Sequence, residues 1–199
     1  MQFFTLRCYN HDETVSFLSN GLFERLKTTF IVDEKNDLNP NENQMQWCGK
    51  LVSVVISTVP ESIELFLQLD LFRIYSFLLS EGNDLLKSSA MMVISQLVFY
   101  LGQQPGLISL LNPELFVGIT TNALDMISHD QSQIVTSVLD YLFSSLSIEP
   151  IKMIVLPIIL ENENSETIKE IAHDVDSEPD MANKAGLIER IIDESIENE

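Results

Sequence analysis

The sequence predicts an all-α fold in which one helical unit is repeated along the chain. A pattern of Leu, three other residues and then Leu-Phe occurs at residues 18–23, 67–72 and 111–116. Leu67 lies 49 residues after Leu18, and Leu111 lies 44 residues after Leu67. These distances are close to the period of helix pairs or triplets that stack on one another. Apolar residues between the copies recur at steps of three and four, and strand signals are nearly absent.

Each copy of the pattern is followed by a polar gap and then by a longer amphipathic helix. In the first unit the gap, residues 33–43, is the longest polar loop, which accounts for the longer first period. A helix that cannot bury its apolar face alone must stack on a neighbour. The apolar stripe of the first long helix is predicted to contain Trp47, Leu51, Val54, Val55 and Thr58.

The second and third units carry clearer stripes, and Gly or Pro residues separate them from their neighbours. In the second unit the spacing predicts a helix over residues 84–101. Its predicted buried stripe contains Leu86, Ala90, Val93, Ile94, Leu97 and Leu101. The corresponding stripe of the third unit contains Val135, Val138, Leu139, Leu142 and Leu146.

The C-terminal part differs in charge from the rest of the chain. Residues 161–199 hold 13 Asp or Glu against 3 Lys or Arg, a net charge of −10, whereas the first 160 residues hold 17 against 8, a net charge of −9. We therefore expect a helical repeat domain over residues 1–164 and an acidic helical segment over residues 165–199. A final helix over residues 179–198 is expected to cover the open end of the stack, and the alternative is a detachable helix that docks on a partner.

The chain resembles the armadillo and HEAT family of helical repeats over roughly residues 11–147. The carrying segments are HDETVSFLSNGLFERL, ESIELFLQLDLFRIYSFLLSEGNDLLKSSAMMVISQL and NPELFVGITTNALDMISHDQSQIVTSVLDYL. The resemblance implies a right-handed α-solenoid of about three repeats plus a C-terminal helix, with a concave face that grips proteins. The glycine that armadillo repeats usually carry occurs once, as Gly21, and Asp70 and Glu114 stand at the matching positions. The choice between armadillo and HEAT therefore stays open.

Charge and composition exclude several classes of partner. The net charge of −19 would repel a nucleic-acid backbone or an anionic membrane surface, and the Lys and Arg residues are scattered singly. The apolar stretches at residues 90–101 and 151–160 are shorter than a membrane span. Two cysteines, no Asn-x-Ser/Thr sequon and no signal-peptide pattern favour a cytoplasmic or nuclear protein with reduced thiols.

Candidate catalytic and metal sites are weak. His11, His129 and His173 each precede an Asp, as in a helical metal-dependent phosphohydrolase, but His-Asp pairs also suit helix ends. The acidic residues 174–180 resemble a calcium loop, but Pro179 and Ala185 stand where an EF-hand needs Gly and Glu. We therefore expect no metal, no cofactor and no enzymatic activity.

The partner-binding surface of such a stack is expected on the concave ridge made by the last helix of each repeat, on the side away from its apolar stripe. Met92 and Phe99 are the notable members, because large apolar side chains that face outward often mark partner contacts, although packing under a neighbouring helix is the alternative. Ten ridge residues are predicted by helical projection, namely Ser53, Ile56, Ser88, Met92, Ser95, Phe99, Gln133, Ser137, Asp140 and Ser144.

These observations favour a non-catalytic scaffold or adaptor that binds a protein, with a preference for a partner that has a basic surface. A regulatory subunit that positions an enzyme such as a protein phosphatase is the first alternative. A helical metal-dependent phosphohydrolase is a remote alternative that depends on the His-Asp pairs alone.

Overall fold

The computed structural model describes residues 10–30, 42–128, 131–161 and 164–197. Within these ranges the secondary structure is helical and contains no strand, which confirms the all-α prediction. The elements are α1 (His11–Ser19), α2 (Leu22–Phe30), α3 (Glu42–Thr58), α4 (Ser62–Gln68), α5 (Leu71–Glu81), α6 (Asp84–Leu101), the 3-10 helix η1 (Pro105–Leu110), α7 (Pro113–Asp125), α8 (Ser132–Leu146), α9 (Glu149–Leu160), α10 (Asn164–His173) and α11 (Pro179–Glu197).

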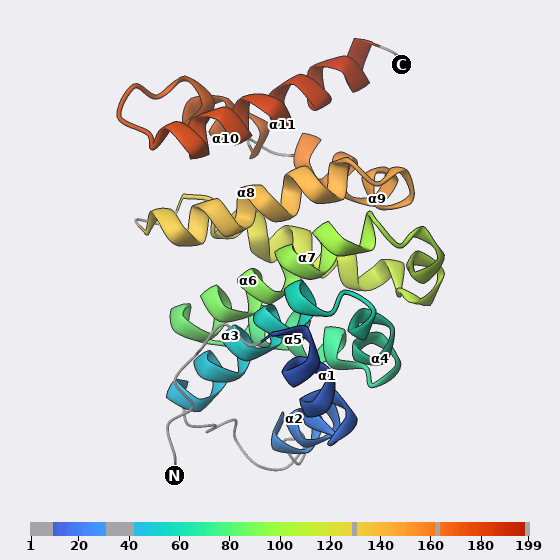
Figure 1. Ribbon diagram of the computed structural model, residues 1–199. Coiled ribbons are helices and arrows are strands. Elements are labelled where there is room, and N and C mark those ends of the chain that lie inside the picture. The colour runs from blue at the N-terminus through green and yellow to red at the C-terminus, as the bar shows by residue number, and fades with distance from the viewer. Residues whose placement is uncertain (1–9, 31–41, 129–130, 162–163, 198–199) are drawn as a thin grey trace.

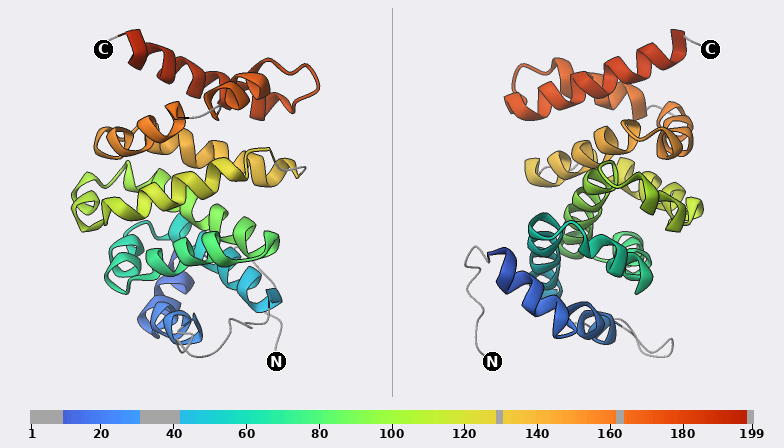
Figure 2. Two further views of the ribbon diagram at one scale, coloured as in Figure 1. Left: turned by 180° about the vertical axis from the view of Figure 1, so that it is seen from behind. Right: turned by 45° about the vertical axis from the view of Figure 1, so that its right-hand side comes forward.

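The helices follow one another in chain order from one end of the molecule to the other (Figure 1). The long helices α3, α6, α8 and α11 form one layer, in which each packs against the next. The shorter helices α5, α7 and α9 pack against one another as a second layer beside it (Figure 2). Because α6 packs on α5 and α8 packs on α9, the two layers enclose the apolar interior.

One hydrophobic cluster runs through the molecule, from Phe23 in α2 to Ile192 in α11. Helix α6 has the predicted bounds, and all the stripe residues predicted for α6 and α8 are buried in this cluster. Ile168, Ala185 and Ile188 of the C-terminal segment belong to the same cluster. The division of the chain after residue 164 stays a prediction. Because α11 packs on α8, a substitution in α11 can test it.

The stripe predicted for the first long helix is wrong. Of its five residues only Val55 is buried, and Trp47 is 49% exposed, with the Lys50 ammonium 5.2 Å from its ring centroid. The buried face of α3 is offset by about one position, and one residue turns a helix face by about 100°. The residues that fill it are Val52, Val55 and Ile56. Most of the predicted polar loop at 33–43 lies outside the described residues, and its last two residues belong to α3.

The turns that open the first two units share one backbone conformation. Gly21, before α2, has φ of 77°, and Asp70, before α5, has φ of 60°. Both lie in the left-handed region, which glycine adopts without strain and which aspartate tolerates better than most residues. Glu114 lies inside α7, where the Asn112 carboxamide oxygen accepts a hydrogen bond of 3.0 Å from its backbone N–H. The third unit therefore begins its helix with a different turn.

Helices α3 and α6 approach closely at Gly49. A Cβ atom at this position would lie 2.0 Å from the Ser89 Oγ atom of α6, well inside van der Waals contact. The absence of a side chain at Gly49, opposite a small side chain on α6, allows this close packing.

Contacts between successive long helices recur at a nearly constant sequence separation. Ser53 of α3 hydrogen-bonds Gln96 of α6 at a separation of 43 residues, and Asp140 of α8 pairs with Lys184 of α11 at a separation of 44. The Gln104 side chain also donates to the Pro60 carbonyl at 3.0 Å, 44 residues away. Both α3 with α6 and α8 with α11 are thus joined by a polar side-chain contact at nearly the same sequence separation.

A buried tyrosine between α7 and α8 makes the free energy of unfolding depend on pH in the alkaline range. The Tyr141 hydroxyl lies 2.8 Å from Thr120 Oγ1, and burial raises its pKa well above 10.0, although the hydrogen bond with Thr120 lowers it in part. The unfolded chain ionises this tyrosine first, so the stability present at neutral pH is lost as the pH rises beyond about 10. We expect the free energy of unfolding in urea to fall above this pH, and to fall less steeply in Tyr141→Phe. Equal slopes for the two proteins would contradict this expectation.

Candidate functional site

The surface between α6 and α8 carries a cavity of about 300 Å³ that is open to solvent. Helix α6 supplies four of its lining residues and α8 supplies three, because their outer faces lie next to each other in the same layer. The lining residues are Met92, Ser95, Gln96, Phe99, Ser137, Asp140 and Ser144. Every one of them except Gln96 is among the predicted ridge residues. We call this site the α6–α8 cavity.

The other four ridge residues lie elsewhere. Ser53 is half-buried on α3, and its hydroxyl donates a hydrogen bond to the Gln96 side chain, so it adjoins the cavity. Ser88 is half-buried and Gln133 is exposed, and neither lines the cavity. Ile56 is fully buried in the core. Its predicted place on the exposed ridge is wrong because the stripe of α3 is offset.

The cavity combines an apolar edge with small polar groups. Phe99 is 54% exposed, and its ring meets that of Tyr100 edge to face at a centroid distance of 5.1 Å. Ser95 is buried, and its hydroxyl donates to the Met92 carbonyl at 3.0 Å. The Ser137 hydroxyl likewise donates to the carbonyl of Gln133 at 3.1 Å. Since these hydroxyls already bond their own helices, Gln96 and Asp140 are the stronger polar groups of the lining.

Asp140 is the one charged residue among those that line the cavity. Its carboxylate forms an ion pair with the ammonium group of Lys184, which reaches it from α11. The Asp140 side chain is 45% exposed and the Lys184 side chain is 26% exposed. The site therefore places a carboxylate where a cation can reach it from solvent, beside exposed apolar surface.

Two residues of this site were missed from the sequence. Gln96 lies four residues after Met92 and three before Phe99, so helical spacing places it on the same face and would have found it. Lys184 lies on another helix, and only the repeat distance of 44 residues from Asp140 could have indicated it.

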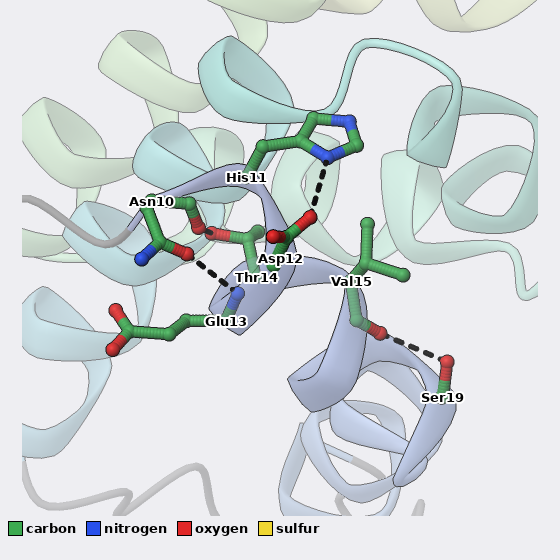
Figure 3. Close-up of polar contacts among 7 residues, drawn as sticks. All are labelled: Asn10, His11, Asp12, Glu13, Thr14, Val15 and Ser19. Atoms are coloured by element: carbon green, nitrogen blue, oxygen red, sulfur yellow. Dashed lines mark hydrogen bonds and ion pairs between the residues drawn. The ribbon is translucent and has the colours of Figure 1, made fainter.

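The His-Asp pair at residues 11 and 12 lies in the first turn of α1 (Figure 3). The His11 Nδ1 atom is 3.8 Å from the Asp12 carboxylate, and both side chains are exposed. The cap of this helix is Asn10, whose side-chain oxygen accepts a 2.9 Å hydrogen bond from the Glu13 N–H. Thr14 Oγ1 also donates to the Asn10 carbonyl at 3.1 Å. Figure 3 thus shows the capped start of a helix, at which His11 and Asp12 contact each other.

The other candidate metal residues are not brought together with this pair. His173 ends α10, where its Nε2 atom lies 3.2 Å from the Glu189 carboxylate. His129 and its following Asp lie outside the described residues. Across residues 10–30, 42–128, 131–161 and 164–197, no three His, Cys, Asp or Glu side chains form a group that could hold a metal ion.

Residues 174–178 of the acidic segment form the turn between α10 and α11, and residues 179 and 180 begin α11. The Asp174 carboxylate accepts hydrogen bonds from the Asp176 N–H at 3.0 Å and from the Ser177 hydroxyl at 3.2 Å. Pro179 begins α11, a position that suits its fixed φ. These contacts give Asp174 a structural role in closing the turn.

Two further features bear on the expected chemistry and location. Cys48 of α3 is a free thiol whose pKa burial raises, so less of the reactive thiolate forms at neutral pH, and Cys8 lies outside the described residues. Among the described helices, α6 is long and apolar enough to cross a membrane by length and composition alone, although only a shorter stretch of it was considered from the sequence. In this structure 56% of α6 is buried inside the molecule.

The sequence matches no protein-family model and no curated protein.

Proposed function

We propose that this chain is a right-handed α-solenoid of the armadillo/HEAT class that acts as a non-catalytic scaffold or adaptor. In this proposal the α6–α8 cavity holds a protein partner, in the cytoplasm or nucleus. The two helical layers and the recurring separations of 43 and 44 residues support the repeat architecture. Stacked repeats with these properties commonly present an extended binding surface.

The observation that carries the proposal is the composition of the cavity edge. Phe99 exposes 54% of its surface beside the half-buried Met92, and large aromatic residues and Met are enriched in protein interfaces. Fully burying a Phe side chain is worth about 1.5–3 kcal/mol, so a partner that covers Phe99 would gain a useful part of this free energy.

The charge of the protein supports a basic partner. A net charge of −19 speeds encounter with surfaces of the opposite sign and disfavours acidic ones. This preference is consistent with Asp140, which brings the same sign of charge to the cavity itself.

We expect Phe99→Ala to weaken partner binding at least about fivefold, because truncation of a large aromatic hot-spot residue at the centre of an interface costs more than about 1 kcal/mol. Tagged wild-type protein and Phe99→Ala are used to isolate partners from native cells, and the dissociation constant of the purified partner is then measured by calorimetry. Val117→Ala is the matched control, since Val117 is 46% exposed on α7 and does not line the cavity. The wild-type complex should also weaken as salt rises.

The proposal would be overturned if a purified partner bound Phe99→Ala and wild-type protein with the same affinity. Loss of affinity in Val117→Ala alone would place the interface on the second layer of helices instead.

A further inference from the structure

The ion pair between Lys184 and Asp140 brings a cation from the C-terminal segment to the edge of the α6–α8 cavity. Lys184 lies in the second turn of α11, one residue before the fully buried Ala185. Ile188 and Ile192 continue this buried face, which packs α11 against α8. The backbone of Lys184 is therefore fixed next to the cavity, while its long side chain extends to Asp140.

The pair shows which chemistry the cavity accepts. Asp140 is the one charged side chain of the lining, and its carboxylate forms an ion pair with the Lys184 ammonium group. Both side chains reach solvent, and exposed ion pairs of this kind are weak because water and salt screen them. The Lys184 side chain can therefore leave Asp140 without disturbing the buried face of α11.

An arginine would be the stronger cation for this carboxylate. Its guanidinium group can donate two parallel hydrogen bonds to the two oxygens of Asp140, whereas an ammonium group acts as a point charge. Met92 and Phe99 lie in the same lining and offer apolar surface to a neighbouring side chain. The arrangement fits a segment in which a large apolar residue and an arginine are adjacent.

Resting on the function proposed above, we propose that the partner places an arginine on Asp140 and an apolar side chain against Met92 and Phe99. Lys184 is then an internal competitor that this arginine displaces. The occupant is a basic and apolar segment of a partner protein, and its charge complements both Asp140 and the net charge of the chain. The C-terminal segment thereby sets the affinity of the cavity.

The test uses the full chain and the dipeptide N-acetyl-leucyl-arginine amide as a probe. Binding is followed by NMR from the backbone amide signals of Ser137, Asp140 and Ser144. We expect Lys184→Met to lower the dissociation constant at least about threefold, because Asp140 loses its competitor. Asp140→Asn should raise the dissociation constant in both the wild-type and the Lys184→Met backgrounds.

The matched control is Lys169→Met. Lys169 of α10 forms an ion pair with Asp193 of α11, in which the Lys169 Nζ atom lies 3.6 Å from a carboxylate oxygen of Asp193, so this variant also removes one positive charge. If this variant lowers the dissociation constant of the probe as much as Lys184→Met does, the change in net charge explains the effect and the inference is wrong. The neutral probe N-acetyl-leucyl-glutamine amide should bind wild-type protein and Lys184→Met equally. Tightening of this neutral probe in Lys184→Met would also overturn the inference.

The two proposals fail in different ways. If Phe99→Ala weakens partner binding but Lys184→Met leaves it unchanged, the scaffold function is supported. The proposal that Lys184 competes for Asp140 is then wrong. Probe signals that move only outside the cavity, in every variant, overturn the arginine site itself.

Discussion

Truncation of Leu97 or Leu142 to Ala is expected to lower the free energy of unfolding by about 2 to 5 kcal/mol for each substitution. Both side chains are fully buried, Leu97 in α6 and Leu142 in α8, where the packed layer leaves little room for the surrounding residues to close the cavity. Urea unfolding followed by circular dichroism measures the change. The matched control is Leu110→Ala, because Leu110 is 53% exposed in η1 and its truncation should cost less than about 0.5 kcal/mol.

If the urea midpoints of Leu97→Ala and Leu142→Ala equal that of Leu110→Ala, the described packing of α6 against α8 is wrong. The α6–α8 cavity would then lose its structural basis as well.

Truncation of Ile188 to Ala is expected to cost about 2 to 5 kcal/mol in the same cooperative transition. Ile188 is fully buried on α11 and belongs to the cluster that also contains Leu142 of α8. Its neighbour Leu187 is 43% exposed, so Leu187→Ala provides a control on the same helix. Calorimetry, which resolves separate transitions, is the suitable measurement.

The outcome for Ile188→Ala also decides the division predicted after residue 164. If residues 165–199 form an independent unit, the main transition stays unchanged and a separate, smaller transition shifts. If the segment is part of the stack, the single transition moves to lower temperature.

The long helices could be predicted from the sequence where their apolar residues follow a regular spacing. In α6 and α8 the predicted stripes are the buried faces, because Leu, Ile and Val recur on one side at steps of three and four, even though Met92 and Phe99 lie on the outer side of α6. In α3 the spacing is ambiguous, because apolar residues also lie on the outer side. Helical spacing predicts Trp47 on the buried stripe, whereas the structure leaves it at the surface beside Lys50. Hydrophobicity alone cannot resolve a shift of one position in such a helix.

The candidate site could be predicted in part for the same reason. The residues that α6 and α8 contribute to the cavity follow from the outer faces of correctly predicted helices. Ile56 could not be placed correctly because it depends on the register of α3. The contribution of Lys184 is a tertiary contact from α11, and a projection of one helix contains no information on its neighbours.

The close approach at Gly49 has a mechanical consequence for the whole molecule. Each long helix packs against the next, so the angle at which α3 crosses α6 affects where the following helices lie. Three interaxial distances of about 9 Å lead from α3 to α11, so a rotation of about 10° at this crossing would displace α11 by roughly 5 Å. A side chain at position 49 would force α3 and α6 apart at this crossing. We therefore expect Gly49→Ala to change the orientation of α3 relative to α6, and with it the spacing of the helices that follow.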